Sequence, residues 1–200
     1  MNPVTEQTST PVKPLRADAR RNHERVLVAA RKCFADHGYE AQMTDVASEA
    51  GVGVGTVYRH FPDKTALVEA LVAERFRQFR EGAEQALEAH DAWAGFRGWL
   101  EACAEIQAED RMVCDFITEA VGAERRDAIA QEEGLDEATR TVIDHAKSAG
   151  AIRKTVEPED IPGLMCGLGA VARSDPGDRI WRRQFEFALE GMREPSYSAT

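Results

Sequence analysis

The chain has 200 residues, with 25 lysines and arginines against 35 aspartates and glutamates, and a formal net charge of −10 at pH 7. This length predicts one large domain or two small ones. The longest run without a charged residue, 161–172, is too short to span a membrane, and no apolar stretch follows a basic N-terminus as in a secretory signal. We therefore expect a soluble, cytoplasmic protein with no membrane partner.

Charge is distributed unevenly along the chain. Residues 1–64 have a net charge of +1 and residues 65–200 of −11, and residues 11–32 contain seven basic side chains against two acidic ones. A basic front segment on an acidic body is compatible with a protein that contacts a polyanion at one end. Taken alone, the charges favour the simpler interpretation, which is a solvated helix face.

The first third of the chain predicts an arm followed by helices. Residues 1–19 are expected to form a disordered basic arm. Apolar residues at helical spacing then predict a helix that stops at Gly38. Short helices are expected at about 43–50 and 54–60, and Asp63 can cap a long helix after them.

The remainder of the chain is also predicted to be helical. Apolar stripes at helical spacing run through 93–103, 112–121 and 135–146, Pro158 opens another helix, and the last helix follows residue 177. No window alternates with a period of two residues. We therefore expect an all-α fold, with a flexible tail at 196–200.

Residues 42–61 contain the pattern that is most informative about function. Two short helices joined by a tight turn need a small residue where they cross, a residue that tolerates positive φ, and apolar residues that fix their angle. Ala47, Gly51 and Val57 meet these needs at spacings of four and six residues. This spacing predicts a helix-turn-helix, whose second helix enters the major groove of DNA.

The chemistry of the second short helix agrees with this prediction. Gly53 and Gly55 near its start would let the backbone approach the groove closely. Hydroxyl, guanidinium and ammonium groups suit phosphates and base edges. Side chains with these groups, and one histidine, are expected at the outward positions of the helix and just beyond its end: Thr56, Tyr58, Arg59, His60 and Lys64.

The segment GVGVGTVYRHFPDKTAL, preceded by DVASEA, resembles the DNA-binding domain of TetR-family transcriptional regulators over about 20–79. The resemblance implies backbone contacts from Thr56, Tyr58, His60 and Lys64, and base contacts from Gly53, Val54 and Arg59. The family usually has threonine at the position of Gln42, where it caps a helix and touches a phosphate. Glutamine is a poor N-cap, and Thr44 is the candidate substitute.

The resemblance implies a second, variable domain, here 80–195, that binds a small molecule and forms a homodimer through its last two helices. Candidate residues of an effector cavity, which are equally compatible with an ordinary core, are Trp93, Phe96, Trp99, Met112, Phe116 and Met165. The last helix is apolar on two sides, which suggests contact with a partner as well as with its own core. The candidate dimer residues are Gly163, Gly167, Ile180, Trp181, Phe185 and Phe187.

Other functions find less support in the sequence. The GVGVG segment follows a helix and satisfies neither GxGxxG nor GxxxxGK[ST], which argues against a phosphate-binding loop. The histidines show no HExxH spacing. The cysteines, which form no CxxC pair, are expected to be buried thiols: Cys33, Cys103, Cys114 and Cys166. We expect no enzymatic activity, no metal and no cofactor.

The sequence therefore predicts a transcriptional regulator that binds double-stranded DNA sequence-specifically. The preferred form is a homodimeric repressor, released from a palindromic operator by a small apolar or aromatic effector, cationic aromatics included. The alternative is a regulatory or architectural DNA-binding protein without small-molecule control. A cavity within 80–175 would favour the first and a solid core the second.

Overall fold

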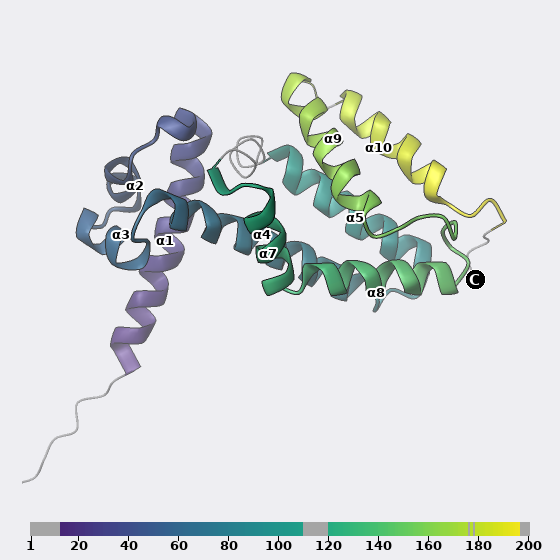
Figure 1. The fold of residues 1–200 in the computed structure, drawn as a ribbon, viewed down its shortest axis with the longest axis horizontal. Coiled ribbons are helices and arrows are strands. Elements are labelled where there is room, and N and C mark those ends of the chain that lie inside the picture. Colours follow the sequence, from purple (N-terminus) through teal and green to yellow (C-terminus); the bar gives the residue numbers. More distant parts are fainter. Residues whose placement is uncertain (1–12, 110–119, 176, 178, 197–200) are drawn as a thin grey trace, which may run out of the picture.

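The computed structural model of the chain describes residues 13–109, 120–175, 177 and 179–196 (Figure 1). Its elements in chain order are α1 (Lys13–His37), the 3-10 turn η1 (Gly38–Glu40), α2 (Met43–Ala50), α3 (Val54–His60), α4 (Lys64–Ala86), α5 (Ala92–Glu109), α7 (Ala123–Glu132), α8 (Leu135–Ser148), α9 (Asp160–Ser174) and α10 (Arg179–Met192). The all-α prediction is confirmed. None of the described helices is both long and apolar enough to cross a membrane.

The first helix begins earlier than the sequence predicted. Residues 13–19 belong to α1, so the expectation that the disordered arm extends to residue 19 is wrong for this stretch. The cause is local, because this part of α1 contains one leucine, one arginine and two alanines, residue types that favour helices. Arg20 and Glu24, which lie one helical turn apart, form an ion pair of 3.7 Å that further stabilises the start of α1. Residues 1–12 and 197–200 lie outside the described part.

The described helices enclose two hydrophobic cores, and α4 contributes to both. The first core contains buried residues of α1 to α4, among them Val26, Phe34, Val46, Val57, Leu67, Leu71 and Val72. The second contains Phe79 and Ala83 of α4 with residues of later helices, among them Trp93, Phe96, Leu100, Ile143, Leu168, Trp181 and Leu189. Figure 1 shows α4 running from the N-terminal helices into the C-terminal bundle. It crosses the boundary that the sequence placed after residue 79.

Helix α7 forms a second connection between the two halves, and the sequence did not predict it. Ile129 is only 2% exposed and packs in the first core, although α7 belongs to the C-terminal half. Arg125 of α7 pairs with Glu69 of α4 at 3.0 Å, and Glu133, just after α7, pairs with Arg77 of α4 at 3.2 Å. These contacts hold α7 along α4.

Helices α4 and α5 approach closely because small residues lie at their contact. A Cβ on Gly95 would lie 2.4 Å from the carbonyl oxygen of Ala86, and one on Gly82 would lie 3.3 Å from Cδ1 of Trp99. The indole of Trp99 donates a hydrogen bond of 3.0 Å to the carbonyl oxygen of Phe79. The indole is thereby fixed against α4, which matters for the cavity described below.

This packing predicts the effect of a methyl group at Gly95. We expect Gly95→Ala to lower the free energy of unfolding by about 1–3 kcal/mol, since α5 must move away from backbone that cannot yield. Gly98→Ala on the same helix is the matched control, because its Cβ would meet nothing within 4 Å. Alanine favours helices, so the control should be neutral or stabilising by up to about 1 kcal/mol in urea unfolding. Equal stability of the two variants would contradict the packing argument.

Candidate functional site

The turn between α2 and α3 depends on Gly51. Its φ of 62° and ψ of 40° lie in the left-handed region, where glycine is favoured. Arg25 of α1 donates a hydrogen bond of 2.6 Å to the carbonyl oxygen of Ala50. A Cβ on Gly51 would lie 3.1 Å from that guanidinium. The turn therefore needs glycine for two reasons, and Arg25, which the sequence analysis missed, ties α1 to it.

The crossing of α2 and α3 is fixed by buried apolar side chains. Ala47 and Val57 are 3% and 0% exposed where the helices meet, as their spacing predicted. Phe61 follows α3 and is also buried. Asp63 caps α4 by accepting a hydrogen bond of 2.8 Å from the backbone N–H of Ala66. Because both ends of α3 are fixed in this way, its outer face has a defined orientation.

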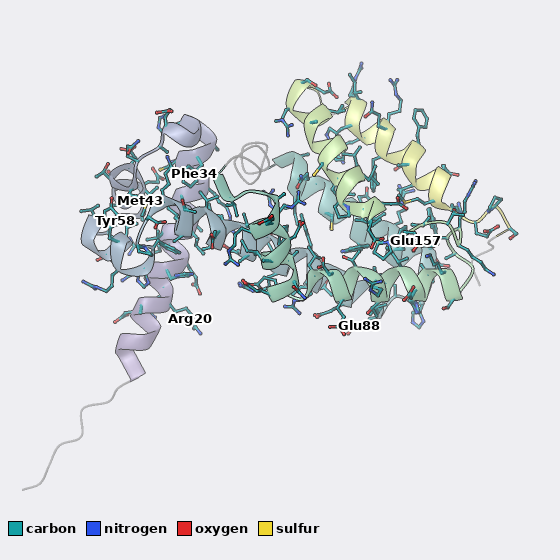
Figure 2. The ribbon with its side chains drawn as sticks, in the orientation of Figure 1. Arg20, Phe34, Met43, Tyr58, Glu88 and Glu157 are labelled. Carbon is teal, nitrogen blue, oxygen red and sulfur yellow. The ribbon has the colours of Figure 1, made fainter. Side chains whose placement is uncertain are left out.

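The outer face of α3 is exposed to solvent. Val54 and Tyr58 are 41% and 49% exposed, and Arg59 is exposed beside them. A Cβ on Gly53 or Gly55 would meet nothing within 4 Å, so the backbone there is open to an approaching molecule. Figure 2 shows Tyr58 on the side of the molecule away from the C-terminal helices. This face can accept a large partner without displacing protein.

The start of α2 is capped differently from what the sequence suggested. The side-chain amide of Gln42 donates to the carbonyl oxygen of Glu40 at 2.7 Å. The backbone N–H of Gln42 instead donates to Asp45 Oδ2 at 2.9 Å, so Asp45 supplies a capping contact for this turn. Gln42 and Thr44 are both exposed, on the same end of α2.

The remaining predicted contact residues are half-buried at the edge of this face. Thr56 and His60 belong to α3, and Lys64 begins α4. The ammonium of Lys64 lies 5.8 Å from the centre of the Phe34 ring, and burial lowers the pKa of this lysine. The ammonium of Lys64 therefore lies near α1, and the charge of Glu40 acts on its pKa in the opposite direction to burial.

A ring cluster joins α1 to α3 at the same edge. The His23 ring lies 4.9 Å from the Phe61 ring and 5.7 Å from the His60 ring, measured between centroids. Burial lowers the pKa of His23, and the nearby His60 lowers it further, while Glu74 and Glu24 act in the opposite direction. The structure thus favours neutral His23.

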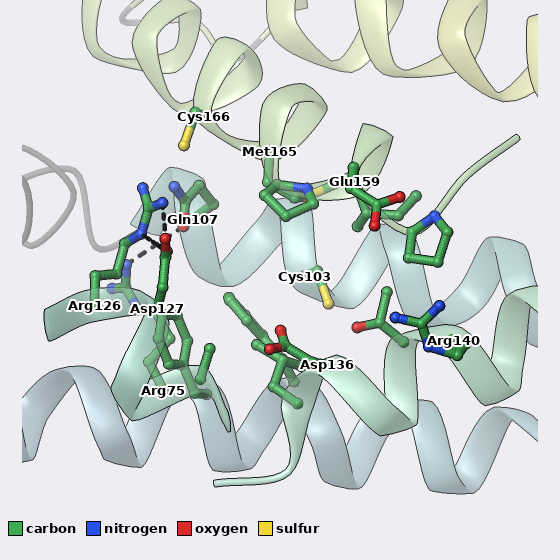
Figure 3. Close-up of a pocket in the computed structure, with 18 of the residues that line it drawn as sticks. Arg75, Cys103, Gln107, Arg126, Asp127, Asp136, Arg140, Glu159, Met165 and Cys166 are labelled. Atoms are coloured by element: carbon green, nitrogen blue, oxygen red, sulfur yellow. Dashed lines mark hydrogen bonds and ion pairs between the residues drawn. The ribbon is translucent and has the colours of Figure 1, made fainter. Parts of the chain in front are cut away.

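A cavity of about 410 Å³ lies in the C-terminal half, between α4, α5, α7, α8 and α9 (Figure 3). Of the predicted effector residues, Trp99 and Met165 line it. Trp93 and Phe96 instead pack in the second core, since the same helical stripe of α5 faces both the core and the cavity. Met112 and Phe116 lie outside the described residues. The cavity size is typical of small-molecule sites.

The three cysteines that the structure describes differ in burial. Burial raises the pKa of the Cys103 thiol to about 12, and burial also raises that of Cys33. Cys166 is exposed, so the expectation that it is a buried thiol is wrong, and it lines the cavity together with Cys103. Cys114 lies outside the described residues. Among the residues that the structure describes, no group of three or more His, Cys, Asp or Glu side chains is arranged to hold a metal ion.

The predicted dimer residues separate into two groups. Trp181 and Phe185 are 1% and 2% exposed and belong to the chain's own core, so their assignment to a dimer contact is wrong. They lie one helical turn apart on the inner face of α10. Ile180 and Phe187 are 42% and 67% exposed on the outer face. Two exposed α9 glycines with open space above them, Gly163 and Gly167, were also among the predicted residues.

Comparison with known protein families finds two matches that together cover most of the chain. The model of bacterial regulatory proteins of the tetR family matches residues 26–71. The model of the C-terminal domain of SbtR-like transcriptional regulators matches residues 88–194. The two matches agree with the division of the helices into an N-terminal and a C-terminal half.

Individual relatives agree with these matches. A TetR transcription regulatory protein from Mycobacterium vanbaalenii is 30% identical, with 90% of this chain and 99% of that chain covered and a TM-score of 0.67. A TetR transcriptional regulator from Streptomyces coelicolor, 24% identical over 87% of this chain and 99% of that chain, shares the fold with a TM-score of 0.67. An HTH-type transcriptional regulator of Staphylococcus aureus strain USA300 is 44% identical over 54 residues, which are 26% of this chain and only 29% of that protein.

The lowered pKa of His23 predicts a pH dependence of stability. A histidine whose folded-state pKa lies below its ordinary value of 6.5 stabilises the fold fully above pH 6.5, and this contribution is lost as the pH falls toward the folded-state pKa. His23→Gln should remove it. We expect the loss of unfolding free energy between about pH 7.5 and about pH 5.5, measured in urea, to be smaller in the variant. An equal or larger loss would contradict the assignment.

Proposed function

The chain belongs to the TetR family of transcriptional regulators, and from this premise we propose that it is a homodimeric repressor that a small molecule releases from a palindromic operator. One observation carries the proposal: α4, which packs in the same core as α3, also forms a wall of the cavity through Arg75, Phe76 and Phe79. The helix that a bound ligand would touch is thus the helix on which the DNA-binding half is built.

The outer face of α3 is proposed to enter the major groove. The open backbone at Gly53 and the exposed side chains of Val54 and Arg59 support base contacts. Groups at the edge of the face are proposed to bind phosphates, namely those of Gln42, Thr44, Thr56, Tyr58, His60 and Lys64.

A dimer through the outer faces of α9 and α10 is proposed. Ile180 and Phe187 are large apolar side chains left exposed on α10, and Gly163 and Gly167 would let a partner helix approach α9 closely. A two-fold dimer places two recognition helices about 34–36 Å apart, which matches half-sites one turn of DNA apart. The symmetry of such a dimer is the reason to expect a palindromic operator.

Effector control is supported by the two connections between the cavity and the DNA-binding half. Helix α4 contributes to both cores, and α7 lines the cavity with Ala130 while Ile129 packs in the first core. A ligand shifts an equilibrium only by its different affinity for the two states. A cavity whose walls are these two helices changes shape when the DNA-binding half moves, which supports the regulated form over the unregulated alternative.

The DNA-binding proposal predicts different effects from two cationic residues. Lys64→Ala should weaken binding to every sequence and reduce the slope of log affinity against log salt by about one, as for one lost phosphate contact. Arg59→Ala should instead change the preference among bases, with a cost of about 1–3 kcal/mol at one position of the selected site. Both are measured on DNA selected from a random pool.

The control for this pair is Lys154→Ala, an exposed lysine in the C-terminal half. It should bind the selected DNA like the unmodified protein, with the same salt slope. If Lys64→Ala and Arg59→Ala also behave like the unmodified protein, the outer face of α3 is not the DNA-binding surface.

The dimer proposal is tested at Phe187. We expect Phe187→Glu to give folded monomers in sedimentation, since it places a charge in the apolar contact while its side chain is 67% exposed in one chain. Val28→Glu is the matched control, because Val28 is 63% exposed on α1 and should leave the dimer intact. Trp181→Glu should unfold the protein rather than dissociate it. Folded dimers of Phe187→Glu would exclude this interface.

A further inference from the structure

The polar residues of the interior are concentrated at one place. Among the residues that the structure describes, three polar or charged residues are buried, namely Arg75 (3% exposed), Gln107 (7%) and Thr139 (7%). All three line the cavity, and they come from three different helices, α4, α5 and α8. Burial of polar groups is costly, and charged residues are rarely buried. Their convergence on one cavity indicates a built polar site within an otherwise apolar interior.

Arg75 and Gln107 form the deep end of this site. Arg75 Nη1 donates to Gln107 Oε1 at 3.4 Å. Gln107 also packs against α9, where a Cβ on Gly169 would lie 3.1 Å from its Cγ. The amide is therefore held between α4 and α9. Figure 3 shows these two residues at one end of the cavity and Arg140 and Glu159 at the other.

The charges around the cavity differ in depth. Arg126 and Asp127 form an ion pair of 2.7 Å and are more exposed than Arg75. Asp136, Arg140 and Glu159 are exposed at the rim. The buried charge in the lining is thus positive, while the rim has charges of both signs. At the deep end, the N–H groups of Arg75 can donate to an anion or another acceptor, but not to a cation.

The remaining walls are apolar. Phe76 and Phe79 of α4, Trp99 of α5, and Ile161 and Met165 of α9 surround the space next to the polar end. Trp99 is fixed by its hydrogen bond to the carbonyl oxygen of Phe79. A ligand that fills this space must present apolar or aromatic surface along most of its length.

We propose that the cavity binds a monocarboxylic acid with an apolar or aromatic body, and that Arg75 binds its carboxylate. The proposal rests on the proposed effector function and names the chemical class of the effector. A guanidinium has five N–H donors in a planar fork that matches a carboxylate, so contacts with protein and ligand can coexist. The guanidinium and the amide at the deep end offer donors that suit the two oxygens of one carboxylate better than the larger charge of a phosphate dianion. This replaces the cationic aromatic class that the sequence had allowed.

The proposed site lies next to a contact with the DNA-binding half. Glu74, which precedes Arg75 on α4, pairs with Arg31 of α1 at 2.7 Å. Successive residues of a helix point about 100° apart, so one turn of α4 faces the cavity with one side chain and α1 with the next. A carboxylate bound by Arg75 therefore acts on the segment of α4 that holds α1.

The experiment compares acids with neutral molecules of the same shape. Decanoate, 4-phenylbutyrate and indole-3-acetate are titrated into the full chain by calorimetry, each beside its primary amide. We expect at least one acid to bind at least tenfold more tightly than its amide. In Arg75→Met this preference should disappear, while Arg75→Lys should retain part of it. Arg80→Met, on the same helix but outside the cavity lining, should keep the full preference.

Two further measurements keep the test valid if Arg75→Met unfolds. Thr139→Val removes only a hydroxyl and should weaken acid binding severalfold. A bound acid should also slow modification of Cys166, which is exposed and lines the cavity, as measured by mass spectrometry.

The outcomes separate the two proposals. If amides bind as tightly as acids, or Arg75→Met keeps the preference, the carboxylate inference is overturned while an effector function stands. If neither acids nor amides bind or change the affinity for selected DNA, the effector function fails, and the inference fails with it.

Discussion

Both hydrophobic cores of this protein are built around one helix, α4. Leu67 and Leu71 are buried in the first core, Phe79 and Ala83 in the second, and Phe76 packs against both. The backbone hydrogen bonds of a helix are internal, and α4 is continuous over Lys64–Ala86 from one core to the other. The helix that packs with α3 in the first core therefore also forms part of the cavity wall.

Helix α7 forms a second connection between the N-terminal and C-terminal halves. Ile129 is buried in the first core, while Arg126 and Ala130 line the cavity from the same helix. The Arg125–Glu69 ion pair joins α7 to α4 on the side of the DNA-binding half. Two connections constrain orientation as well as position, and they are the structural basis of the proposed effector control.

Helix α10 shows what an apolar pattern in the sequence can and cannot predict. Trp181 and Phe185 form one stripe, and Ile180 and Phe187 lie beside it; the sequence showed both. It could not tell which stripe faces the chain's own core, because both have the spacing of an amphipathic helix. The position of α10 against α9 and the second core buries the first stripe and exposes the second. Helix α7 was missed for the opposite reason, since it has one large apolar residue, Ile129, and no stripe.

The helix-turn-helix was determined by the sequence itself, because its requirements are local. Ala47, Gly51 and Val57 lie within eleven residues, and each is needed for a steric reason that a short segment already imposes. The polar end of the cavity was decided by tertiary structure alone. Arg75 interrupts the apolar stripe of α4, which was a visible signal, but an arginine in a stripe can equally extend to water. Only the packing of α5, α8 and α9 around it places Gln107 and Thr139 on the same cavity and excludes water from its charge.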